Sequence, residues 1–259
     1  MIQVKQTLNE HKEEICLFYS FLDDILSKDG RLLIDPPENT VQNIRVETMA
    51  ILKASFLMML YNCVESTVTN CLNAIIRSIH DEGCKYEELS EHLQQVATAA
   101  YAYRVNLCET RDKRNEKEKE RNDFIIGLTP VVLDIKSMVG SSSQGTFSGS
   151  LDAREIRNLL CAKLGLDLTE LTCNEMVKTR DVRNKLAHGE KSFQECGRDL
   201  SIQYLNVSKT NTLEYLDTLV STVEDYVDKK SFKKKSCDEN RGFLNRWFNS
   251  LSIWWKSLL

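Results

Sequence analysis

Two residues near the end of a predicted helix have side chains suited to chemistry on a phosphate. In the segment RDVRNKLAHGE, residues 180–190, Arg183 precedes His188 by five residues and Gly189 follows as the expected helix stop. A histidine at a helix C-terminus titrates near neutrality, as a proton-transferring group must, and a guanidinium can hold two phosphate oxygens at once. The pair predicts metal-free RNA cleavage, in which His188 removes the 2′-hydroxyl proton and Arg183 stabilises the phosphorane.

The spacing of the pair favours a site shared by two chains. Five residues turn a helix by about 500°, so Arg183 and His188 point about 140° apart and do not share one narrow face. A two-fold axis would bring the same patch of two chains together and make the site composite. The spacing alone does not exclude a second reading, in which His188 caps the helix carbonyls and Arg183 forms a surface ion pair.

Two polar residues of a long apolar helix are further candidates for the site. The string LYNCVESTV places Asn62 and Glu65 three residues apart, on one face of the helix. Buried polar groups need partners, so Glu65 is expected to orient Arg183 or His188, and Asn62 to bind the scissile phosphate. Lys185 is a second expected substrate contact. A structural Asn62–Glu65 pair that only fixes helix packing explains the same pattern.

The elements that must position these residues are predicted to be helices, in an all-α fold. Only 10 Gly and 3 Pro are present, too few for the turns of many short strands. In residues 5–28 the residues expected to face inward are Ile15, Leu17, Phe18, Phe21, Leu22 and Ile25. Apolar periodicity predicts helices over 5–28, 40–79, 87–123, 152–163, 174–188 and 211–230, the second of them central and buried, with a low-complexity loop at 137–150.

Composition predicts one main domain, residues 1–230, followed by an appendage, residues 231–259. Residues 229–259 carry eight Lys or Arg and two acids, a charge of +6. Because the whole chain has a net charge of −4, the preceding residues carry −10. An acidic body is a poor general surface for nucleic acid, so any RNA binding must be confined to a local cleft.

The chain is expected to be a cytoplasmic protein without a cofactor or a metal. Its first residues lack the basic and apolar regions of a secretory signal, and the longest charge-free run of the central helix, between Lys53 and Glu65, has 11 residues, too few for a membrane span. The nine Cys show no C-x-x-C spacing and are expected to be reduced, with several, including Cys16 and Cys108, in buried apolar positions.

Several longer strings resemble a known family. RNKLAHGE resembles the signature of the HEPN superfamily, and four further strings are similar to the stand-alone prokaryotic HEPN-like nucleases of the MAE type: LYNCVESTV, FSGSLDAREIR, RDVRNKLAHGEKSFQECGRDL and NTLEYLDTLVSTVEDY. The similarity covers roughly residues 5–230.

This resemblance implies an up-and-down helical bundle that forms a homodimer, or a heterodimer with a related HEPN protein, across the motif helices. It implies a metal-independent endoribonuclease acting in toxin–antitoxin or antiphage defence, beside an antitoxin or defence partner. Arg183 and His188 would be the catalytic pair, Asn184 the polar residue between them and Glu65 the supporting acid. A non-catalytic HEPN protein that binds RNA, or that serves as the antitoxin subunit, is the alternative.

The C-terminal segment lies outside the resemblance. Five lysines between 229 and 235 lead into RGFLNRWFNSLSIWWKSLL, residues 241–259, where the apolar and Trp side chains fall on one helical side. Such an amphipathic helix fits docking onto the body or a partner protein, which we favour, or a membrane surface, or RNA with the Trp rings stacked on bases. A membrane-acting effector, in which this helix causes the damage, is a third functional class.

Overall fold

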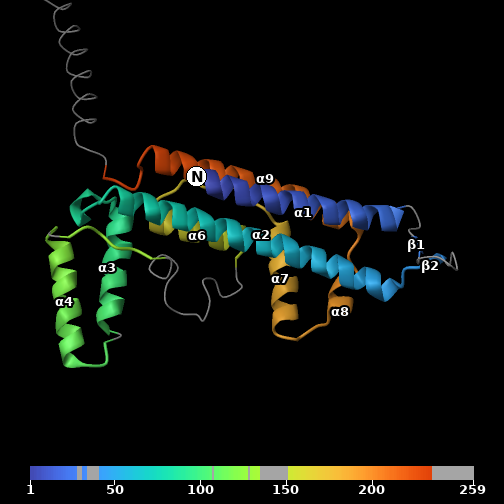
Figure 1. Cartoon of the computed structure of the whole chain (residues 1–259), viewed down its shortest axis with the longest axis horizontal. Helices are drawn as coiled ribbons and strands as arrows, with labels where there is room; N and C mark the ends of the chain where they lie inside the picture. Colours follow the sequence, from blue (N-terminus) through green and yellow to red (C-terminus); the bar gives the residue numbers. More distant parts are fainter. Residues whose placement is uncertain (28–30, 34–40, 107, 128, 135–150, 235–259) are drawn as a thin grey trace, which may run out of the picture.

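The computed structural model describes residues 1–27, 31–33, 41–106, 108–127, 129–134 and 151–234 (Figure 1). Within these ranges, every helix is too short or too polar to cross a lipid bilayer.

The fold is all-α, as predicted, apart from one short antiparallel strand pair. The elements follow one another along the chain as α1 Ile2–Ser27, β1 Arg31–Leu33, β2 Val41–Asn43, α2 Val46–Asp81, the 3-10 turn η1 Tyr86–Glu88, α3 Glu91–Asn106, α4 Arg111–Ile125, α6 Ala153–Leu164, α7 Glu175–Ala187, α8 Phe193–Gly197 and α9 Ile202–Asp228.

Helix α2 is the centre of the molecule, because its apolar residues occur nearly all round the helix. It packs against α1, α7, α8 and α9, and it supplies many of the fully buried side chains, among them Phe56, Leu57, Leu60, Leu72, Ile75 and Ile79. The predicted start at residue 40 was wrong, since Val41–Asn43 pairs as β2 with β1 and the helix begins only at Val46.

Three long helices, α1, α2 and α9, form the main layer (Figure 1). On α9, Leu216, Val220 and Val223 are buried. On α1 the inward assignment holds for Ile15 and Leu22, which are fully buried. It was wrong for Leu17 and Phe21, which are 73% and 47% exposed. Helix α1 packs against α2 and α9, and its exposed apolar residues lie outside the stripe that these two helices cover.

The long helix predicted over 87–123 is instead a helical hairpin. Helix α3 ends at Asn106, and α4 restarts at Arg111 after Thr110, whose hydroxyl accepts a hydrogen bond from the Lys113 N–H at 3.4 Å. Phe124 near the end of α4 is buried and stacks on Tyr101 of α3 with a centroid distance of 4.3 Å. This aromatic contact holds the charged α4 against α3 and leaves its remaining surface in solvent.

The chain remains packed on the body up to Lys234, a stretch that includes the domain boundary predicted at residue 230. Phe232 is fully buried and its carbonyl accepts a hydrogen bond from the Ser90 N–H at 2.9 Å. Lys230 and Lys233 both bind the Glu82 carboxylate, at 2.6 and 2.7 Å, and lower the pKa of Glu82 to about 2. We call residues 229–234 the stem. The predicted helix at 241–259 and the loop at 137–150 lie outside the described residues.

Candidate functional site

Helix α7 carries the motif and ends where the sequence predicts. Gly189 has a φ of +68°, the left-handed conformation that glycine adopts at low cost. His188 is the C-cap residue, and its backbone N–H donates to the Asn184 carbonyl at 3.0 Å. The His188 side chain is exposed at this end of the helix, so its imidazole is open to solvent and to any ligand that reaches the end of α7.

Arg183 lies against α2, where an aromatic ring supports it. Its guanidinium carbon is 5.2 Å from the centroid of the Tyr61 ring, a distance at which the ring face attracts a cation. One guanidinium nitrogen donates to the Asn184 side-chain oxygen at 3.3 Å. The Tyr61 ring is buried, and burial, followed by the negative charge of Glu65, raises the pKa of its hydroxyl. Tyr61 therefore remains neutral and acts as a fixed platform for Arg183.

Glu65 is a half-buried carboxylate one helical turn beyond Tyr61. Burial raises its pKa, while the positive charge of Arg183 acts in the opposite direction. No hydrogen bond joins the Glu65 and Arg183 side chains, although both residues are described. Arg183 is thus near enough to feel the carboxylate but is not neutralised by direct contact. The structure thereby brings together three of the predicted site residues, Arg183, Asn184 and Glu65.

Three other predicted site residues do not touch this group. Asn62 is exposed on α2, one residue from Tyr61 and hence about 100° around the helix. Lys185 and His188 are exposed on α7, and no hydrogen bond or ion pair connects the side chains of Arg183 and His188. Within one chain the pair borders α7 on different sides, as the helical spacing predicts.

A buried ion pair that the sequence analysis missed fixes the rotation of α7. Arg180 binds Asp152 and, at 2.8 Å, Asp181. Asp152 is buried, and it also caps α6, accepting from the Glu155 N–H at 2.9 Å. Asp152 therefore joins the start of α6 to the middle of α7, one turn before Arg183. The available signal was the cap position of Asp152 together with Arg180, three residues ahead of Arg183.

A close helix contact, also missed, holds the segment that follows His188. Helix α8 lies within the motif string, and its last residue, Gly197, approaches the α2 backbone so closely that an added Cβ would be 1.8 Å from the Ala50 carbonyl oxygen. The Lys53 ammonium donates to the Leu200 carbonyl at 2.7 Å. Both contacts attach the chain after His188 to α2, so the turn bearing His188 is held at each end.

The assembled groups can bind an anion and exchange a proton. In the described residues no set of three or more His, Cys, Asp or Glu side chains is arranged to hold a metal ion. Among the described residues the Cys side chains are unpaired thiols. Cys63 and Cys71 are buried, whereas the expected burial is wrong for Cys16, which is exposed, and only partial for Cys108, whose exposure is intermediate. The chemistry available on α7 is therefore that of Arg183, Asn184 and His188, supported by Tyr61 and Glu65 of α2.

Comparison with known proteins shows the family of the chain. No curated protein and no solved structure matches the chain. The HEPN_MAE_28990-like HEPN family matches residues 3–232, which include every described helix of the bundle and the whole of the α7 motif. On this match, and with the all-α fold, the chain belongs to the HEPN_MAE_28990-like HEPN family.

Proposed function

We propose that this protein is a metal-independent endoribonuclease whose site is built around Arg183 and His188. The observation that carries the proposal is the state of Arg183: its guanidinium rests on the Tyr61 ring, while Arg180 takes up the nearby carboxylates of Asp152 and Asp181. Among the residues that the structure describes, Arg183 is thus a positioned cation without a bound carboxylate. HEPN domains are generally associated with ribonuclease activity, and such a cation suits a phosphate.

In the proposed reaction His188 accepts the proton of a ribose 2′-hydroxyl, and the 2′-oxygen attacks the adjacent phosphorus. Arg183 and the Asn184 amide stabilise the charge that develops on the phosphoryl oxygens. The 5′-oxygen leaves with a proton, giving a 2′,3′-cyclic phosphate and a 5′-hydroxyl end. Asn62 and Lys185, both exposed near the pair, would contact the flanking RNA.

A second chain would supply the missing half of the site. Arg183 and His188 do not meet within one chain, and a two-fold axis perpendicular to α7, passing between these two residues, would place the Arg183 of one chain beside the His188 of another. The second His188 then serves as the acid that protonates the leaving oxygen. We propose a homodimer or a heterodimer with a related HEPN protein, acting in the cytoplasm as a toxin or defence effector beside a neutralising partner.

The test is RNA cleavage in the presence of EDTA by the protein and its His188→Ala variant. Cleavage by the parent alone, with 2′,3′-cyclic phosphate ends, is the expected result. Equal cleavage by His188→Ala would refute the proposal. Absence of cleavage by both proteins, together with RNA binding, would favour the alternative of a non-catalytic HEPN protein that binds RNA.

A further inference from the structure

The surface of α2 beyond the candidate site is free of acidic residues for about four turns. Residues 66–80 contain no Asp or Glu, although the chain has 38 acids in 259 residues. The side chains that reach solvent there are hydroxyls, amides, one arginine and one histidine: Ser66, Thr69, Asn70, Asn73, Arg77, Ser78 and His80. On an acidic protein, this is the kind of surface where a polyanion meets the least repulsion.

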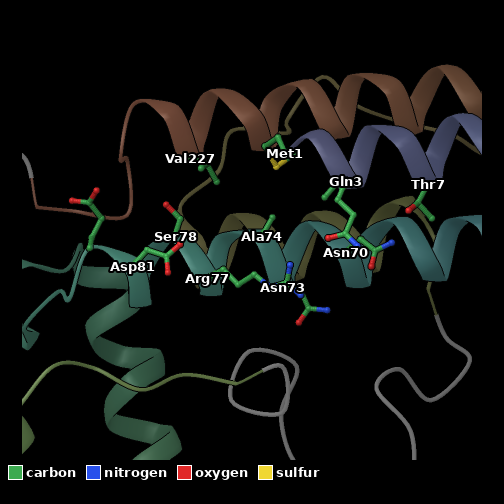
Figure 2. Close-up of a pocket in the computed structure, with 12 residues that line it drawn as sticks. Met1, Gln3, Thr7, Asn70, Asn73, Ala74, Arg77, Ser78, Asp81 and Val227 are labelled. Carbon is green, nitrogen blue, oxygen red and sulfur yellow. The ribbon is translucent and has the colours of Figure 1, made fainter.

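This acid-free surface borders a groove between the start of α1 and the second half of α2 (Figure 2). The groove has a volume of about 460 Å³, sufficient for a group of nucleotide size. Its polar lining includes Gln3 and Thr7 from α1 and Asn70, Asn73 and Arg77 from α2, and its apolar lining consists of Met1, Val4, Ala74 and Val227.

Four polar side chains of the groove have no partner in the described part of the chain. The side chains of Gln3, Asn73 and Arg77, like that of Asn70, make no hydrogen bond or ion pair with any residue that the structure describes. An amide offers a donor and an acceptor side by side, the pattern that pairs with the edge of a nucleobase. A guanidinium offers the fork that binds a phosphate. The lining therefore matches the base edge and the phosphate of a nucleotide.

The groove lies farther along α2 than the candidate site and on a different side of the helix, because the twelve residues between them leave Glu65 and Arg77 about 120° apart. The predicted substrate contact Asn62 lies between the two in angle around the helix. Asn62, Ser66, Asn73 and Arg77 recur at intervals that keep them on a common stripe of α2. The twelve residues from Glu65 to Arg77 span about 18 Å of helix, a length that accommodates a few nucleotides of an extended strand.

Two carboxylates lie at the end of the groove that is farthest from the candidate site. Asp81 follows Arg77 by one turn, and Glu82 next to it is occupied by Lys230 and Lys233 of the stem. Asp81 and Glu82 line the end of the groove beyond Arg77, so a phosphate is confined to the part of the groove between Arg77 and the candidate site.

We infer that this groove is a nucleotide subsite for single-stranded RNA. The position of the cut relative to this subsite rests on the proposed function. One base of the strand hydrogen-bonds to the amides of Gln3, Asn70 and Asn73, and its phosphate binds Arg77, while the scissile bond lies at Arg183. Unstacked bases of single strands expose the edges that such amides read. The site is thereby selective for a base a few nucleotides from the cut.

The test is the binding of fluorescent 2′-O-methyl RNA, which cannot be cleaved through its 2′-oxygen, measured by fluorescence anisotropy. An octamer and a dinucleotide are compared on the parent, on Arg77→Ala and on Asn73→Ala. The matched control is Arg114→Ala, which removes an exposed arginine from α4. Circular dichroism checks that each variant is folded.

The octamer is expected to bind about tenfold more weakly to Arg77→Ala and Asn73→Ala, the loss typical of one bidentate contact, with Arg114→Ala unchanged. The dinucleotide, too short to occupy the groove and the cut together, should bind the parent more weakly than the octamer does. Equal octamer affinity for Arg77→Ala and Arg114→Ala, or no octamer binding by the parent, overturns the subsite. Arg77-dependent binding without RNA cleavage by the parent overturns only the proposed function, so the two failures are separable.

Discussion

The α7 surface and the C-terminal stem both place clustered basic side chains on an acidic protein, but they pair these charges differently. In the stem, Lys230 and Lys233 share the Glu82 carboxylate. On α7, Arg180 takes up Asp152 and Asp181, whereas Arg183 one turn later rests on an aromatic ring. Basic residues in a sequence are therefore not equivalent. Those of the stem hold the chain to the body, while Arg183 remains available to an external anion.

The sharpest test of this contrast is the loss of Arg183. Arg183→Ala should lower the rate of RNA cleavage by roughly 10²- to 10³-fold, because a preorganised cation on the developing charge is removed. The measurement is single-turnover cleavage of a labelled RNA. Arg154→Ala, which removes an exposed arginine from α6, is the control and should cleave at the parental rate. An Arg183→Ala protein as active as Arg154→Ala would remove the distinction between the two regions.

The second test concerns the support of the motif region rather than its charges. Gly197→Ala should destabilise the fold by about 3 kcal/mol, since the new Cβ would overlap the Ala50 carbonyl oxygen and force α8 away from α2. Urea unfolding followed by circular dichroism measures the change. Gly83→Ala is the matched control: it has a φ of +59° but nothing within 4 Å of the added Cβ, so only about 1 kcal/mol of backbone strain is expected. A Gly197→Ala loss no larger than this would contradict the close packing.

The third test separates the ion pair of Asp152 from its capping role. Asp152→Asn keeps an N-cap side chain of nearly equal quality but removes the charge that binds Arg180. We expect a loss of about 1–2 kcal/mol in the free energy of unfolding, the range for a largely buried charge-assisted hydrogen bond. Asp181→Asn, whose carboxylate is about half exposed, should cost less than about 0.5 kcal/mol. Equal effects of the two variants would show that burial of Asp152 adds nothing to the pair.

The smallest effect is expected in the stem, and it depends on pH. The pKa of Glu82 is lowered from 4.5 to about 2 by its two lysines, so the folded state binds its proton less readily than the unfolded state. The stabilisation is therefore complete above about pH 4.5 and is lost as the pH falls toward 2. The difference in unfolding free energy between the parent and Glu82→Gln should shrink over this window. A difference independent of pH would mean that Glu82 stabilises the stem without its charge.

Local sequence signals were sufficient for most of the helices. The apolar periodicity of α2 identified the central helix, Asp152 and Gly165 marked the two ends of α6, and Gly189 marked the end of α7. These signals are local because a cap or a stop depends only on the backbone groups of one turn. The break between α3 and α4 was not predicted, since it depends on Phe124 folding back onto Tyr101, a contact between residues far apart along the chain.

The all-α fold, the family and the identity of the motif residues could be predicted from the sequence, because helix periodicity and the RNKLAHGE string depend only on residues close together in the chain. Only the tertiary structure decided which charges are paired. It placed Tyr61 under Arg183 and Asp152 against Arg180, and it bound the stem lysines to Glu82. Such pairing depends on how helices distant in sequence are rotated against one another, and that rotation is fixed by core packing rather than by any local pattern.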